Sequence, residues 1–244
     1  MTPRQPDGRD VSDPRSNQRW VYESIVGSIP GVSLSRGAAL VLQLVIFEAG
    51  VVALAAGYGR WGSLPAGTVA VVVASAGSVF MLTIGRRTRR LDVPEQYTHT
   101  LFGTGIEIVL GLVAFFALVT YLFVLDPGSG GETVLTGLLG EPLPAPAVFF
   151  TLVVLWDVCY RIGTGWWASL IGLWRSLWLS EALDRETVDE LRRIDAITIG
   201  FAWIQLSLVP FVVGHPILVA AVVGHVVAIT LVSGASILVL RRLK

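Results

Sequence analysis

The chain has 244 residues, of which 53% are hydrophobic and 15% are charged, whereas a soluble domain carries about 25% charged residues. Together with several apolar runs of membrane-spanning length, this composition argues against an ordinary soluble fold. The 18 basic and 18 acidic residues cancel, so no net field attracts nucleic acid, and the single cysteine excludes an intrachain disulfide.

The N-terminal region divides into two parts. Residues 1–18 are polar and carry several Pro and Asp residues, so we expect a disordered tail. Residues 19–35 are predicted to form a short amphipathic helix and a linker, because apolar residues recur at helical spacing before Pro30 and Gly31 end the run. This helix would either lie in the membrane interface or cap the helix bundle.

Six apolar runs follow, each long enough to cross the roughly 30 Å of bilayer hydrocarbon. Within a domain of residues 36–244, we place transmembrane helices at 37–57, 65–85, 101–125, 147–171, 196–213 and 217–240. The sequence therefore predicts an all-α fold, a polytopic membrane helical bundle of six transmembrane helices.

The connections between these runs differ in character. The fourth run continues without a helix breaker to Trp178, which predicts a helix that extends beyond the membrane. The stretch 180–195 is charged and helix-prone, and its apolar residues either dock on the bundle or belong to a solvated helix. These residues are Leu183, Val188, Leu191 and Ile194.

Basic residues alternate between the connections. Sixteen of the 18 lie in the segments 1–36, 86–99, 172–195 and 241–244, whereas the other connections hold only Arg60, and Arg161 falls inside a run. Because basic residues collect on the cytoplasmic side, this distribution predicts a multi-pass membrane protein with both termini in the cytoplasm.

Ionisable and polar groups inside the runs are the candidates for a functional site, because a charged residue in hydrocarbon costs about 2.5–3.5 kcal/mol on insertion scales. Four of them lie on four different helices at a similar depth near the middle of the bilayer, so we expect them to meet in the bundle interior. These four are Glu48, Asp157, Gln205 and His225. The six candidates are Glu48, Glu107, Asp157, Arg161, Gln205 and His225.

Two interpretations of these groups remain open. Asp157 and Arg161 are four residues apart and share a helix face, so the pair either lines a polar cavity or fixes helix register. Glu48 and Glu107 have no basic residue on their own helices. They would either change protonation during proton-coupled transport or act as neutral hydrogen-bonding groups. His225 is either a titrating group or a core residue.

Small residues predict close packing. Gly163 and Gly165 allow another helix to approach or the helix to kink. Ala66, Ala70, Ala74 and Ser78 recur every four residues, as in helix-packing stripes. Such stripes serve packing within the chain or a homo-oligomer.

Motifs for metal, nucleotide or nucleophilic chemistry are missing from the sequence. We therefore expect no metal site, no cofactor and no catalytic residue. The expected partners are the lipid bilayer and either a cytoplasmic protein or a second copy of the chain.

Three runs carry a family resemblance: YESIVGSIPG at 22–31, LWDVCYRIGTGWWASL at 155–170 and AAVVGHVVAIT at 220–230. They resemble a family of uncharacterised haloarchaeal membrane proteins, over most of the chain after residue 20. The resemblance implies a protein of the archaeal plasma membrane and brings no activity, cofactor or binding residue with it.

Three functions compete. A small transporter or channel-like protein would place a midplane polar site in a cavity that touches at least three of Glu48, Asp157, Arg161 and His225. A structural or regulatory protein would keep a closed, dry bundle and act through its cytoplasmic face, formed by the N-terminal helix, residues 86–90 and residues 180–195. A lipid-modifying enzyme would use Glu107 and His99 as acid–base groups.

Overall fold

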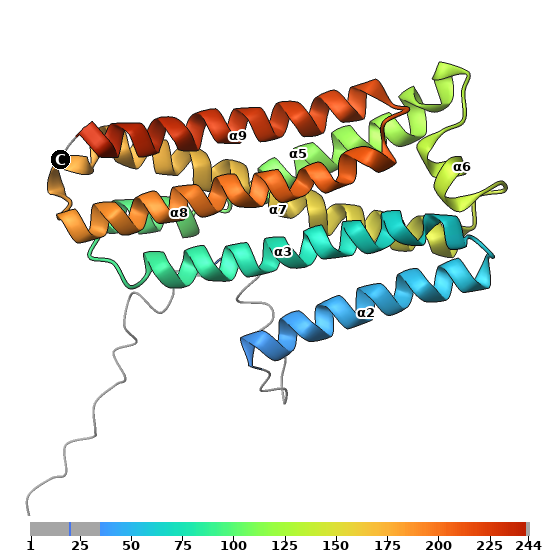
Figure 1. Cartoon of the computed structure of the whole chain (residues 1–244), viewed down its shortest axis with the longest axis horizontal. Coiled ribbons are helices and arrows are strands. Elements are labelled where there is room, and N and C mark those ends of the chain that lie inside the picture. The colour runs from blue at the N-terminus through green and yellow to red at the C-terminus, as the bar shows by residue number, and fades with distance from the viewer. Residues whose placement is uncertain (1–19, 21–34, 243–244) are drawn as a thin grey trace, which may run out of the picture.

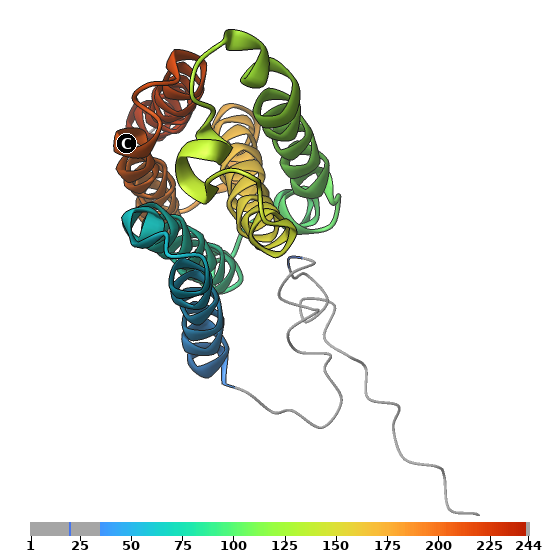
Figure 2. The same cartoon turned by 90° about the vertical axis from the view of Figure 1, so that its right-hand side faces the viewer.

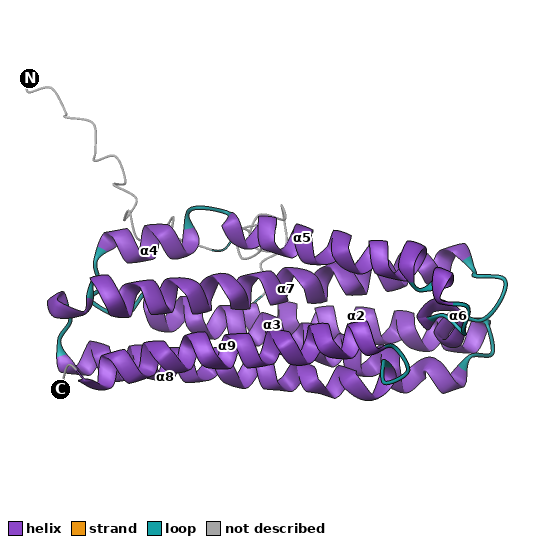
Figure 3. Cartoon of the chain, turned by 90° about the horizontal axis from the view of Figure 1, so that it is seen from above, coloured by secondary structure: helices purple, strands orange, loops and turns teal. Residues whose placement is uncertain are grey.

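The computed structural model describes residue 20 and residues 35–242. The tail expected at 1–18 and the amphipathic helix and linker expected at 19–35 lie outside the described residues, apart from Trp20 and Ser35. Within the described part, all regular elements are helical, and the longer helices run alongside one another (Figure 1, Figure 3).

The α-helices in chain order are α2 (Arg36–Gly57), α3 (Leu64–Thr88), α4 (Glu95–Phe102), α5 (Ile106–Thr120), α6 (Val134–Leu139), α7 (Ala145–Trp178), α8 (Arg185–Ile204) and α9 (Pro216–Arg242). Short 3₁₀ turns lie at η2 (Trp61–Ser63), η4 (Pro127–Ser129) and η5 (Ser180–Ala182). The π-helical turn η3 (Tyr121–Leu125) extends α5, and the 3₁₀ segment η6 (Gln205–Phe211) extends α8.

Six helical segments are long and apolar enough to cross a membrane, as expected for a multi-pass membrane protein. They are Gly37–Gly57, Trp61–Thr88, Glu95–Ser129, Ala145–Trp178, Arg185–Phe211 and Pro216–Arg242. Many of their large apolar side chains point outward: Val41, Val113, Phe116 and Leu231 are each more than 60% exposed. The predicted all-α bundle with six such helices is confirmed.

Local signals explain where these helices begin and end. The Ser35 hydroxyl accepts the N–H of Ala38 at the start of α2, as a helix N-cap does. Pro65 lies in the first turn of α3, where a missing N–H costs nothing. Pro210 lies inside η6, and it cannot donate an α-helical hydrogen bond.

The third apolar run is interrupted, unlike the continuous helix expected at 101–125. Its first residues belong to α4, and α5 begins only at Ile106, after a turn around Gly103 and Gly105. Gly105 adopts a positive φ of 67°, which suits a residue without a Cβ atom.

The charged stretch 180–195 forms η5 and the first half of α8, and this half of α8 docks on the bundle. Val188, Leu191 and Ile194 are buried, so docking, rather than a solvated helix, describes this segment. Asp184 caps α8 by accepting the N–H of Thr187 at 2.6 Å. This hydrogen bond lowers the pKa of the Asp184 carboxyl.

The bundle has two distinct ends, which we call the α6 end and the α4 end after the short helices located there (Figure 3). The largest cluster of buried apolar side chains includes residues of α4 and the first half of α8. Trp20 belongs to it and packs edge-on against Phe102, with ring centroids 4.9 Å apart. Viewed along its axis, the bundle has α2 at its edge, beside α3 (Figure 2).

Candidate functional site

Side chains from α2, α3 and α7 form a polar cluster near the middle of their helices, at what we call the α2–α3–α7 interface. Arg161 Nη2 donates to Asp157 Oδ1 at 2.7 Å. Gln43 Nε2 donates to Asp157 Oδ2 at 3.0 Å, and Ser78 Oγ donates to Gln43 Oε1 at 3.0 Å. One chain of hydrogen bonds therefore joins three helices.

Arg161 is the buried member of the charged pair. Its side chain is 1% exposed, whereas that of Asp157 is 13% exposed. Arg161 Nη1 also donates to Met81 Sδ at 3.2 Å. A Cβ atom at Gly77 would lie 2.1 Å from Arg161 Cδ, so the absence of a side chain on α3 creates the space that the arginine fills.

Glu48 lies in the same interface, on α2. Its Oε1 accepts a hydrogen bond of 2.7 Å from Thr68 Oγ1 of α3. In the described part of the chain, no hydrogen bond joins Glu48 to Asp157 or Arg161. The interface therefore holds two polar groupings, one at Glu48 and one at Asp157.

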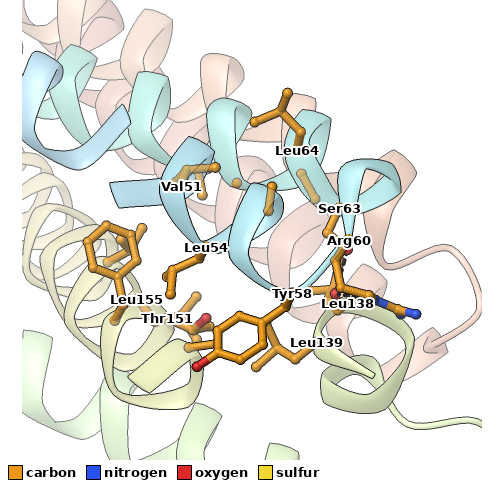
Figure 4. Close-up of a pocket in the computed structure, with 17 residues that line it drawn as sticks. Val51, Leu54, Tyr58, Arg60, Ser63, Leu64, Leu138, Leu139, Thr151 and Leu155 are labelled. Carbon is orange, nitrogen blue, oxygen red and sulfur yellow. Dashed lines mark hydrogen bonds between the residues drawn. The ribbon is translucent and has the colours of Figure 1, made fainter. Parts of the chain in front are cut away.

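A pocket of about 150 Å³ occupies the α2–α3–α7 interface toward the α6 end (Figure 4). Its walls are mainly hydrocarbon, and its lining includes Val51 and Leu54 of α2, Gly67 and Ala70 of α3, Leu139 of α6, and Phe150 and Val154 of α7. Val154 lies three residues before Asp157, about 4.5 Å along the helix axis. The lining contains none of the six candidate residues, and it comes nearest to the polar cluster along α7.

The remaining three candidates lie elsewhere. Gln205 and His225 are on η6 and α9, where the His225 ring packs 5.8 Å from that of Trp166. Gln205 Nε2 and His225 Nδ1 are buried without a hydrogen-bond partner among the described residues. Glu107, on α5, is fully buried. Of the six candidates, only Asp157 and Arg161 are joined to each other by a hydrogen bond or ion pair in the described part of the chain.

Glu107 supports a test of its own. Neither carboxyl oxygen has a hydrogen-bond partner among the described residues, and an unsatisfied buried polar group costs about 1–3 kcal/mol. Replacing Glu107 with methionine, which has a similar length, should therefore raise the midpoint of thermal unfolding in detergent. Glu107→Gln should give a smaller change because the site stays polar. A lower midpoint for Glu107→Met would show that the carboxyl stabilises the fold.

A second buried polar network at the α4 end was not among the sequence candidates. Arg175 of α7 donates to Asp195 Oδ2 of α8 at 2.7 Å and to Tyr97 Oη of α4 at 3.1 Å. Ser236 Oγ of α9 lies within hydrogen-bonding distance of both Asp195 Oδ2, at 2.7 Å, and the carbonyl oxygen of Gly172, at 3.0 Å. Arg175 and Asp195 fall in the predicted cytoplasmic connection 172–195, so neither residue was a candidate from the sequence.

A third polar cluster organises the α6 end. Asp126, at the end of the third span, lies 2.9 Å from His215 Nδ1, just before α9. Its other oxygen accepts the N–H of Val134 at 2.7 Å, at the start of α6, and Tyr121 Oη donates to Oδ1 at 3.3 Å. These contacts tie three connections together.

The described residues offer little support for a metal site or for acid–base catalysis, both of which need several polar side chains close together. Among the described residues, no set of three or more His, Cys, Asp or Glu side chains is arranged to hold a metal ion. Glu107 is fully buried, whereas His99 is exposed, so the two do not share an accessible acid–base site.

Comparison with known proteins identifies a family but no activity. No curated protein matches the chain, and neither does any solved structure. A family model described as "Family of unknown function (DUF7530)" matches residues 15–236, nearly the whole chain. The chain therefore belongs to this family of unknown function.

Proposed function

We propose that this protein is a small membrane transporter and that its substrate moves along the α2–α3–α7 interface. One observation carries the proposal: the apolar pocket between three spanning helices extends along α7 to Val154 and Leu155, just before the charged pair Asp157–Arg161 at mid-length of that helix. Arg161 and Asp157 would give a polar group a favourable contact halfway across the hydrocarbon, where such contacts are rare and costly.

The pocket lining favours an amphiphilic substrate over a bare ion. An ion that entered walls of leucine, valine and phenylalanine would lose its hydration without gaining ligands. An apolar chain would gain contact with the same walls. The substrate of this interface therefore combines an apolar part with a polar head.

The arginine distribution supports an orientation. Arg60 lies near the α6 end, where it bonds to α6, whereas Arg86, Arg87, Arg241 and Arg242 end their helices at the opposite end. By the positive-inside rule, the α6 end faces outward and both termini face the cytoplasm. The pocket then lies in the outer leaflet of a plasma membrane, which the family resemblance suggests is archaeal.

Translocation in liposomes tests this function. Purified protein is reconstituted with NBD-labelled phosphatidylglycerol, and dithionite then quenches the label in the outer leaflet. Protein-free vesicles should keep the inner-leaflet signal, and vesicles with protein should lose it. A signal that persists equally in both would refute transport of this class of amphiphile.

The double variant Asp157→Asn/Arg161→Gln tests the route. Removing both charges avoids an unpaired buried ion. Loss of charge-assisted contacts of about 1.5–3 kcal/mol should slow translocation about tenfold or more. Glu107→Gln, on α5 and outside the interface, is the matched control and should leave the rate unchanged. Equal rates for the double variant and the unaltered protein would exclude this route.

A second candidate is a structural or regulatory protein that acts through the α4 end. It is favoured by the closed packing there, where Arg175, Asp195 and Trp20 are all buried, beneath a surface with the ion pairs Arg87–Glu190 and Arg193–Glu190. If this candidate holds, reconstituted protein should move no lipid, and a specific crosslink from an engineered cysteine at Glu186 should join it to a cytoplasmic protein.

A further inference from the structure

The pocket at the α2–α3–α7 interface has the size and lining of a site for an apolar group. Its volume is about 150 Å³, and its mainly apolar walls favour contact with an apolar group over contact with water. Three of its walls, α2, α3 and α7, are membrane spans. Bilayer lipid is therefore the apolar molecule that surrounds it.

Polar and aromatic residues gather at the α6 end of this pocket. Tyr58, Arg60 and Ser63 belong to the lining, and Trp61, between them in sequence, is 56% exposed. Aromatic residues of this kind are typical of the membrane–water interface. A lipid chain inside the pocket would thus have its headgroup near Arg60.

The partners that the described residues offer to Arg60 are neutral. Its Nη2 donates to the carbonyls of Gly137 at 2.6 Å and Thr136 at 3.3 Å, and its Nε donates to Leu138 O at 3.5 Å. In Figure 4, Arg60 lies beside Leu138 of α6. Among the described residues, no carboxylate lies within 4.0 Å of its guanidinium nitrogens. In this part of the chain its positive charge is therefore not paired with an acid, and no described hydrogen bond uses Nη1.

We propose that the pocket binds a chain of an anionic membrane lipid, with the headgroup phosphate bound at Arg60. Guanidinium is the preferred protein group for phosphate oxygens, and the free donors at Nη1 face no competing acid. This inference rests on the proposed function in naming its substrate class, but binding is measurable without transport.

Native mass spectrometry of the full chain in detergent tests the inference. The probes are phosphatidylglycerol and phosphatidylcholine with identical chains, glycerol phosphate and inorganic phosphate. The unaltered protein should bind phosphatidylglycerol about tenfold more tightly than phosphatidylcholine, a difference of about 1.4 kcal/mol. Neither chain-free phosphate should compete. Equal affinity for the two lipids would overturn the role of Arg60, and competition by free phosphate would show that the chain is not bound.

Variants separate the contribution of charge from that of shape. Arg60→Gln should abolish the preference for phosphatidylglycerol, and Arg60→Lys should retain most of it. Ser63→Ala is the matched control for the attachment of α6, because Ser63 Oγ also donates to Leu138 O but carries no charge. A lost preference in Ser63→Ala would mean that the position of α6, and not the charge, matters.

Filling the pocket provides the complementary test. Ala70→Leu places three extra carbons in the lining and should weaken both lipids. Ala53→Leu, at an exposed position of α2 outside the lining, should weaken neither. Unchanged affinity in Ala70→Leu would remove the pocket as the chain site. The expected binding pattern without translocation in liposomes would refute only the proposed function, whereas translocation without headgroup preference would refute only this inference.

Discussion

Replacing Gly163 with alanine is expected to destabilise the bundle by about 3 kcal/mol, near the upper part of the range for overpacking. A Cβ atom at this position would lie 2.4 Å from Gly111 N, 2.7 Å from Glu107 O and 2.9 Å from Gly111 Cα. All three atoms belong to the α5 backbone, so no side-chain rotation relieves the clash. The two helices would have to move apart along their shared interface.

The neighbouring glycine supplies a matched control. A Cβ atom at Gly165 would meet only the Phe201 ring, at 3.9 Å, which is ordinary contact. Alanine favours helix over glycine by about 1 kcal/mol, so Gly165→Ala should be neutral or stabilising. Thermal unfolding in detergent should therefore give a much lower midpoint for Gly163→Ala than for Gly165→Ala. Equal midpoints would show that α5 and α7 separate without cost.

The contrast between these two glycines shows which part of the helix packing could be predicted from the sequence and which part could not. Both lie in the same short run, and their spacing predicts close helix contact without saying which residue makes it. Gly111, the counterpart of Gly163, lies in an apolar run of α5 with no distinguishing pattern. The number of apolar helices of membrane-spanning length depends only on apolar length, and this is why it was predictable.

Among the polar groups, contacts between residues close in sequence could be predicted, whereas contacts between distant residues could not. The Asp157–Arg161 pair was predictable, because residues four apart on one helix are neighbours. The hydrogen bond between Gln43 and Asp157 joins residues 114 positions apart, and local spacing cannot reveal it. Gln205 Nε2 and His225 Nδ1 make no hydrogen bond to this pair among the described residues, because a shared depth fixes position along the membrane and not direction around the bundle.

The buried network of Arg175 and Asp195 was not predicted, although the spacing of Arg175 from Arg161 indicates it. Arg175 follows Arg161 by fourteen residues, nearly four helical turns, so both project from similar faces of α7. Arg175 was counted among the basic residues of a cytoplasmic connection for the positive-inside rule, so its shared helix face with Arg161 was not considered. Asp195 was likewise counted as part of a charged connection, although it lies within α8.

Breaking the Arg175–Asp195 pair should be at least as damaging as the Gly163 change. Arg175 and Asp195 have side chains 0% and 4% exposed, and removing one member leaves the other buried and uncompensated, at a cost of about 3–5 kcal/mol. Arg175→Met should therefore strongly lower the unfolding midpoint in detergent. Arg193→Met is the matched control. Its ion pair with Glu190 is exposed, and such pairs contribute about 0–1 kcal/mol.

A double substitution separates the value of the pair from the cost of an orphaned charge. Arg175→Met/Asp195→Leu removes both ions, and replacing a buried ion pair by apolar residues is often neutral or stabilising. The double variant should therefore recover most of the stability that Arg175→Met loses. Ser236 and Tyr97 would still lose a partner, at about 1 kcal/mol for each neutral hydrogen bond, so recovery should stop short of the original midpoint. If the double variant is as unstable as the single one, the network itself, and not the unpaired carboxylate, holds α4, α7, α8 and α9 together.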